Sequence, residues 1–171
     1  MIVAAVSDTQ VAPDAMPGSP RFVPDEFEVP QSLMGDGFRL EPLGPQHNAS
    51  DHQAWSSSID HIRATPGFTA ADWDGDTWPY AMPAEANLAD LEMHAGEFER
   101  REAFAYTVLG TAGAVIGCVY IDPDTTGVAD AMVRCWVSAP HAHLDAALAD
   151  SVAQWLRTEW PFATVRFPGR T

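Results

Sequence analysis

The stretch WVSAPHAHLDAAL, Trp136 to Leu148, decides how this sequence folds and what it can bind. Its first residues have the alternation of a strand, Pro140 ends that strand, and Asp145 opens an apolar run with helical spacing. Two histidines, His141 and His143, lie between strand and helix. Three interpretations fit this turn: a metal site, a cradle for a phosphate group, or a plain strand-to-helix connection.

The metal interpretation of this turn is incomplete. His141, His143 and Asp145 match the beginning of the H-x-H-x-D-H pattern of dinuclear sites, but Ala146 stands where its last histidine belongs. Two histidines supply only part of a zinc coordination sphere, so we expect no metal. The plain interpretation is a solvated turn that leads into a capped helix, with Asp145 at the N-cap or in the first turn. The remaining alternative is that one of the histidines contacts an anion.

The loop ADWDGDTWPYAM, residues 71–82, combines acidic and aromatic side chains. It begins like a calcium loop, but Thr77 stands where glycine is needed and Pro83 where the closing glutamate belongs, so we expect no calcium. Carboxylates and indoles together can bind an organic cation through charge and cation–π contact. The simpler alternative is that the tryptophans pack on the core.

The formal net charge of −15 limits the possible partners. Nucleic acids and anionic membranes attract basic surfaces, so we expect neither, and a cationic or neutral partner fits better. All nine basic residues are arginine, which excludes a Schiff-base lysine and a Walker phosphate loop. No apolar run approaches transmembrane length and the first residues lack a signal-peptide pattern, so we expect a cytoplasmic protein. Cys118 and Cys135 fit small core residues in a reducing compartment.

The positions of the prolines and the periodicity of the apolar residues divide the chain into an arm and one domain. Five prolines within residues 1–34 predict an extended arm that can dock through the apolar side chains of RFVPDEFEVP, and residues 35–171 predict the domain. Strands are predicted at residues 38–43, 104–109, 114–121, 129–137 and 163–167. Helices are predicted at residues 48–62, from Asn87 as a cap, and from Asp145 to Trp160. This order predicts an antiparallel meander followed by a helical crossover to a parallel last strand.

This order, with these lengths, resembles the fold of the GNAT N-acetyltransferases over residues 37–169. The segments RLEPLGPQHN, SSIDHIRATPGF, VIGCVYI and LDAAL…WP are similar to a subgroup of small bacterial GNAT-like proteins. The resemblance implies an α+β fold with a mixed, mostly antiparallel sheet and helices on both faces. It also implies transfer of an acyl group from acetyl-CoA or another acyl-CoA to a small-molecule amine, and the acidic charge favours a cationic acceptor.

The resemblance places the acyl-CoA site at the end of the fourth predicted strand. In GNAT enzymes the backbone of that strand binds the pantetheine, and a glycine-rich loop binds the pyrophosphate at the next helix N-terminus. The residues in these places are Trp136, Val137, Ser138, His141, His143 and Leu144. This stretch lacks the glycines and the arginine of that loop, and Asp145 is itself an anion at the helix start. We therefore expect acetyl-CoA to bind weakly.

The same resemblance places the acceptor beside the first helix and the aromatic loop. The substrate-binding candidates are Trp55, His61, Asp76, Trp78 and Tyr80. Asp130 is a candidate general base for the amine, and the alternative is a solvated turn residue.

Two functions therefore remain open. The first is an N-acyltransferase, and the second is a catalytically degenerate GNAT-like module that binds a ligand or a partner chain without turnover. The sequence ends at Thr171, just after the last predicted strand, where usual GNAT enzymes continue. We expect a C-terminally minimal domain whose last strand is covered by the arm or by a second copy in a homodimer.

Overall fold

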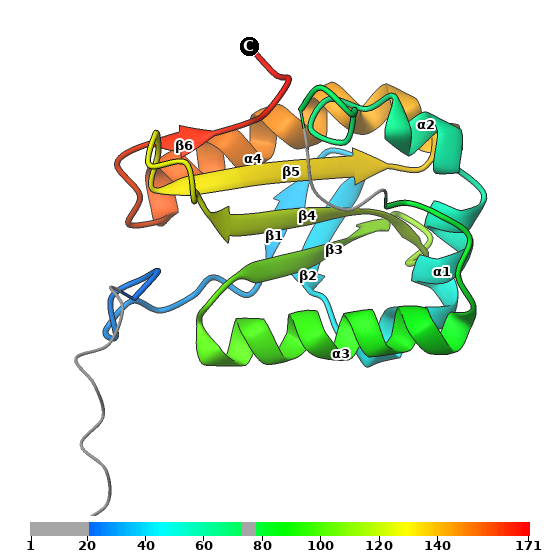
Figure 1. Ribbon diagram of the computed structural model, residues 1–171, viewed down its shortest axis with the longest axis horizontal. Helices are drawn as coiled ribbons and strands as arrows, with labels where there is room; N and C mark the ends of the chain where they lie inside the picture. The colour runs from blue at the N-terminus through cyan, green and yellow to red at the C-terminus, as the bar shows by residue number, and fades with distance from the viewer. Residues whose placement is uncertain (1–20, 73–77) are drawn as a thin grey trace, which may run out of the picture.

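The structure is a computed structural model that describes residues 21–72 and 78–171, and it contains one mixed sheet (Figure 1). The strands are β1 (Leu33–Gly35), β2 (Phe38–Pro42), β3 (Phe104–Gly110), β4 (Val115–Pro123), β5 (Ala131–Val137) and β6 (Val165–Arg166). The helices are the 3-10 helix η1 (Pro45–His47), α1 (Asn48–Ser56), α2 (Ile59–Arg63), α3 (Ala84–Arg100), the 3-10 helix η2 (Ala139–Leu144) and α4 (Asp145–Glu159). None of the helices in these described ranges has the length and apolar character that a membrane span requires.

The strand order confirms the predicted architecture. Strands β1 to β5 pair antiparallel with their neighbours, and β6 pairs parallel to β5 after the α4 crossover. The β5–β6 ladder holds only two pairs, Ala131 with Val165 and Met132 with Arg166. Because β5 continues to Val137, the two strands part well before β5 ends. The fold is α+β, as expected.

The two faces of the sheet are covered by different helices (Figure 1). On one face α4 packs Leu148, Val152 and Leu156 against alternate residues of β4 and β5. On the other face the α1 residue Trp55 and the α3 residue Leu91 pack against the opposite set. This arrangement confirms the predicted alternation of β5, and it puts the two free, buried cysteines on opposite faces.

Three local predictions need correction. The strand β1 was not predicted, although the dipeptide Asp36–Gly37 is a typical hairpin turn and Gly37 adopts the left-handed φ of +85° that such a turn uses. The predicted first helix is two helices, α1 and α2, because the chain breaks around Ser57 and Ser58. Asn87 does not cap α3, which begins three residues earlier at Ala84.

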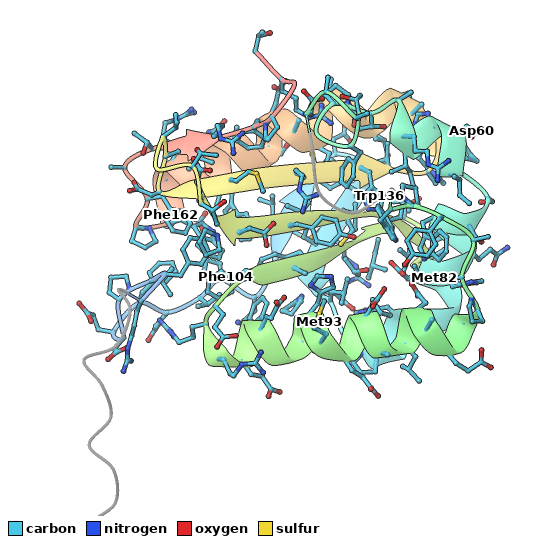
Figure 2. The ribbon with its side chains drawn as sticks, viewed as in Figure 1. Asp60, Met82, Met93, Phe104, Trp136 and Phe162 are labelled. Carbon is cyan, nitrogen blue, oxygen red and sulfur yellow. The ribbon has the colours of Figure 1, made fainter. Side chains whose placement is uncertain are left out.

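The described part of the arm docks on the body, as predicted (Figure 2). Val23 is buried, and the Phe22 ring stacks on the rings of Phe104 and Phe162. The Arg101 guanidinium donates to two carbonyl oxygens of the arm. This part of the arm does not pair with β6, which is the last strand of the sheet in the described chain.

Candidate functional site

A cavity of about 340 Å³ lies on the sheet face that α1 and α3 cover. Its polar lining consists of Asp51, Asn87, Asp90, His94, Asp122 and Arg134. Its apolar and aromatic lining consists of Leu43, Phe68, Trp78, Leu91, Met93 and Tyr120. Three carboxylates against one guanidinium give this cavity an acidic character, and its aromatic rings supply faces that attract cations.

One wall of the cavity is a buried network around Asn87. The Asn87 side chain donates to Asp51 Oδ2 at 3.0 Å and to Asn48 Oδ1 at 2.9 Å, and its Oδ1 accepts from Trp55 Nε1 at 2.9 Å. Asp51 is 4% exposed, and this burial raises its pKa although the bond from Asn87 lowers it. A carboxylate held in an apolar setting beside a cavity is a common feature of functional sites.

A second carboxylate of the cavity lining, that of Asp122, lies on β4. Burial raises the pKa of Asp122, and the Arg134 guanidinium, 3.5 Å from its Oδ2, opposes that effect. The same guanidinium lies 5.4 Å from the centre of the Phe68 ring and 5.8 Å from that of Tyr120. The sheet thus presents a carboxylate, a guanidinium and aromatic faces to one space.

His94 joins these groups from α3. Its Nδ1 lies 3.1 Å from Glu97 Oε2, and its ring centre lies 5.5 Å from that of Tyr120. A carboxylate on one ring nitrogen fixes the orientation of a histidine and leaves the other nitrogen for a ligand. Burial raises the pKa of the Tyr120 hydroxyl well above its usual range, so this group is a neutral hydrogen-bonding partner.

The predicted acceptor residues are only partly brought together. Trp78 lines the cavity, and Trp55 lies behind it at a ring distance of 6.0 Å. Tyr80 is 42% exposed and lies outside the cavity lining. His61 on α2 also lies outside that lining. Asp76 and the central part of the aspartate loop fall outside the described residues.

The end of β5 adjoins the cavity through Trp136, whose buried indole is 6.0 Å from that of Trp78 (Figure 2). Val137 and Ser138 are buried as well. In η2 the His143 side chain is exposed, His141 Nδ1 lies 2.9 Å from Ser138 Oγ, and Leu144 packs on the core. Within residues 21–72 and 78–171, no group of three or more histidine, cysteine, aspartate or glutamate side chains is placed to hold a metal ion.

The backbone of this turn offers few groups to a phosphate. The N–H of Ala139 donates to Ser58 Oγ at 2.9 Å, and the N–H of His141 donates to Ser138 O at 2.8 Å. These N–H groups are therefore already used inside the protein. The turn is the 3-10 helix η2, which is kinked at His141 (φ −110°, ψ 16°).

Of the two positions expected for Asp145, the N-cap and the first turn of the helix, the structure has the second. The residue is the first of the helix, and no side-chain hydrogen bond closes that helix end. Its two carboxylate oxygens instead accept from the guanidinium of Arg170, each at 2.8 Å. Its negative charge is thus balanced by a partner 25 residues further along the chain.

The structure places Asp130 at the opposite end of β5, before its first residue. Its carboxylate Oδ2 accepts from the backbone N–H groups of Ala163 and Thr164 at 2.8 and 2.9 Å. These two bonds lower the pKa of Asp130, and the bond from Thr164 has the larger effect. They also fix the position of the chain that enters β6. Asp130 is not among the residues that line the cavity.

Asp51, His94 and Asp122 line the cavity but were not predicted from the sequence. Asp51 lies one helical turn before Trp55, and Asp122 continues the alternation of Cys118 and Tyr120 on one face of β4. The predicted strand ended at Ile121, whereas β4 continues to Pro123, so Asp122 was left outside the prediction. The contacts from α3 had no such local signal, because they depend on how that helix packs.

Comparison with known proteins supports the fold. No protein-family model and no curated protein sequence matches the chain. A probable acetyltransferase matches with a TM-score of 0.59 at 9% identity, over 80% of this chain and 72% of that one. A Vibrio cholerae structure named as a ribosomal-protein-serine acetyltransferase matches with a TM-score of 0.55 at 11% identity, over 72% of this chain and 65% of that one.

The microcin C7 self-immunity acetyltransferase MccE, in complex with acetyl-CoA and AMP, matches with a TM-score of 0.52 at 11% identity, over 77% of this chain and 68% of that one. The chain therefore spans 65% to 72% of the length of these three structures. Together with the strand order, these likenesses show that the chain has the fold of the GNAT N-acyltransferases.

Proposed function

We propose that the protein is a GNAT-type N-acyltransferase that moves an acyl group from acyl-CoA to the amine of a small cationic acceptor. The observation that carries this proposal is the acidic, aromatic cavity beside Trp136, on the face of a sheet that has the GNAT fold. A cation entering the cavity meets the carboxylates of Asp51, Asp90 and Asp122. The GNAT-like likenesses at 9% to 11% identity support the fold, and the acceptor is inferred from this lining.

The reaction needs the acceptor nitrogen as a free amine, because an ammonium group has no lone pair. Asp51 and His94 are the cavity groups suited to take its proton, since one is a carboxylate of raised pKa and the other is oriented by Glu97. The amine then attacks the thioester carbonyl carbon and forms the amide bond. The carbon–sulfur bond breaks, and the coenzyme leaves as a thiol after taking up a proton.

The acyl donor, acyl-CoA, can bind along one stretch of open backbone on β5. Beyond Met132 the strand β5 has no β6 pairing, so its carbonyl and N–H groups on that side can hydrogen-bond to the amide chain of pantetheine. The η2 turn supplies less to the pyrophosphate than a glycine-rich loop does. We therefore expect acetyl-CoA to bind with a Kd no tighter than about the hundred-micromolar range.

A second function is favoured by one specific observation. The carbonyl of Cys135, on the open side of β5, already accepts from Arg170 at 3.3 Å. If this contact never opens, the protein binds a cationic ligand in the same cavity without transferring an acyl group. The two functions share the cavity and differ in whether acetyl-CoA binds.

The test is acyl transfer from acetyl-CoA to a panel of small diamines and neutral amines, followed by release of free thiol. We expect turnover with the diamines, and replacing Asp122 with Asn should raise their KM roughly tenfold to a hundredfold, because a charge-assisted bond contributes about 1.5–3 kcal/mol. Asp36→Asn is the matched control, since Asp36 lies exposed in the β1–β2 turn away from the cavity. Calorimetric binding of a diamine without thiol release would establish the second function instead.

A further inference from the structure

The side of β5 that faces away from β4 is open beyond its short pairing with β6. The ladder ends at Met132, and β5 continues to Val137. The N–H of Ser138 donates to the carbonyl of Ile116 at the end of the β4 strand pair. The backbone N–H and C=O groups of successive strand residues point to opposite sides of the strand. Since Ser138 points toward β4, the backbone groups of Val137 and Cys135 point away from β4, into the gap that β6 leaves open beyond Met132.

Arg170 occupies this gap. Its guanidinium donates to the carbonyl of Cys135 at 3.3 Å and to both carboxylate oxygens of Asp145 at 2.8 Å each. The Arg170 side chain is 16% exposed, and the bonds to Asp145 raise its pKa, so it stays charged. A two-oxygen pairing of this kind is among the stronger polar contacts in proteins. One side chain thus connects the edge of β5 to the first residue of α4.

The segment 167–170 is also fitted against the loop that follows α2, and Figure 1 shows the two running side by side near the end of the chain. A side chain at Gly169 would collide with the carboxylate of Asp72. That carboxylate accepts from the N–H of Gly67 at 3.0 Å and from Thr69 Oγ1 at 2.7 Å. The segment 167–170 is therefore held in a defined position at the open edge of β5 by contacts with the loop after α2 and with Cys135.

We propose that the segment 167–170 is an internal competitor of the acyl donor, and that Arg170 must leave Cys135 before acyl-CoA can bind. This inference rests on the proposed function, which needs the open edge of β5. An amide N–H group of pantetheine bound at this edge would donate to the carbonyl oxygen of Cys135, which already accepts from Arg170. The ion pair between Arg170 and Asp145, which we call the latch, holds the Arg170 guanidinium in the gap beside Cys135.

The test is calorimetric titration of the full chain with acetyl-CoA. We expect Arg170→Gln and Asp145→Asn each to bind acetyl-CoA about tenfold or more tightly than wild type, since each removes charge-assisted bonds that hold the gap closed. Two variants on opposite sides of the latch guard against a folding defect in one, and thermal unfolding checks both. Arg157→Gln is the matched control, because Arg157 is an exposed arginine near the far end of α4.

A second readout follows the segment itself. In wild type, saturating acetyl-CoA should speed amide hydrogen exchange in residues 167–170, because a displaced segment loses the contacts that hold it in position. Unchanged affinity in both latch variants would overturn the inference alone. Weaker affinity in Arg170→Gln would also overturn it, and would show that Arg170 holds the donor. If none of the four proteins binds acetyl-CoA, the proposed function is wrong and the inference falls with it.

Discussion

The buried amide of Asn87 gives the sharpest test of the cavity wall. Asn87 is 4% exposed, and its side chain bonds to Trp55, Asp51 and Asn48 across three separate hydrogen bonds. Replacing Asn87 with Ala removes all three bonds. It leaves the Trp55 N–H and the Asp51 carboxylate buried without this partner.

The magnitude follows from those two groups. Each buried polar group without a partner costs about 1–3 kcal/mol, and the better helix propensity of alanine returns only about 0.5 kcal/mol. We therefore expect the free energy of unfolding to fall by about 2–5 kcal/mol. A helix cap, the role that the sequence suggested for Asn87, would contribute only about 1 kcal/mol. The two interpretations thus differ by a measurable amount.

The assay is urea unfolding followed by tryptophan fluorescence, with the exposed α3 residue Glu92 replaced by Ala as the control. The pH dependence supplies a second check. Burial raises the pKa of Asp51 and Asn87 lowers it, so the variant raises that pKa further. A raised folded-state pKa favours folding at low pH, so the loss should shrink as the pH falls from 7 toward 4. A loss below about 1 kcal/mol that does not change with pH would refute the network.

Three other changes test the arm, the sheet and the base. Replacing Arg101 with Ala removes the donors that hold the arm, so limited proteolysis should cut residues 21–29 faster; an unchanged rate would mean that the aromatic contacts suffice. Gly117→Ala would drive a Cβ into the carbonyl oxygen of Trp136, so we expect a loss of roughly 1–3 kcal/mol or more in thermal unfolding, and wild-type stability would contradict the spacing of β4 and β5. Asp130→Asn should reduce acyl transfer far less than the roughly hundredfold that loss of a general base causes. Because backbone bonds lower the pKa of Asp130, this variant should also lack the part of the acid destabilisation that wild type shows as pH falls through that pKa.

The strands show how far local pattern carries. The order and spacing of the predicted elements gave the antiparallel meander and the parallel last strand correctly. The β1–β2 hairpin could have been predicted from the dipeptide Asp36–Gly37, because its turn chemistry is equally local. These features depend on residues that are close in sequence.

The cavity shows where local pattern stops. Trp78 was predicted on the acceptor side and lines the cavity, whereas Asp51, His94 and Asp122 were not singled out. No residue near Asp51 in the sequence predicts its hydrogen bond with Asn87, which is 36 residues away. The pairing forms only because α1 and α3 pack side by side on the same face of the sheet.

The sequence by itself determined the order of the elements, the faces of the strands and the absence of a glycine-rich turn before α4. Those properties follow from periodicity and from single residues, which act over a few positions. Only the tertiary structure decided what Asp145 does, because its partner Arg170 lies 25 residues further along the chain, after β6, and reaches Asp145 only in the folded protein. The carboxylate that the sequence placed at the start of a helix does lie there, and in the folded protein it is also one half of an ion pair with Arg170.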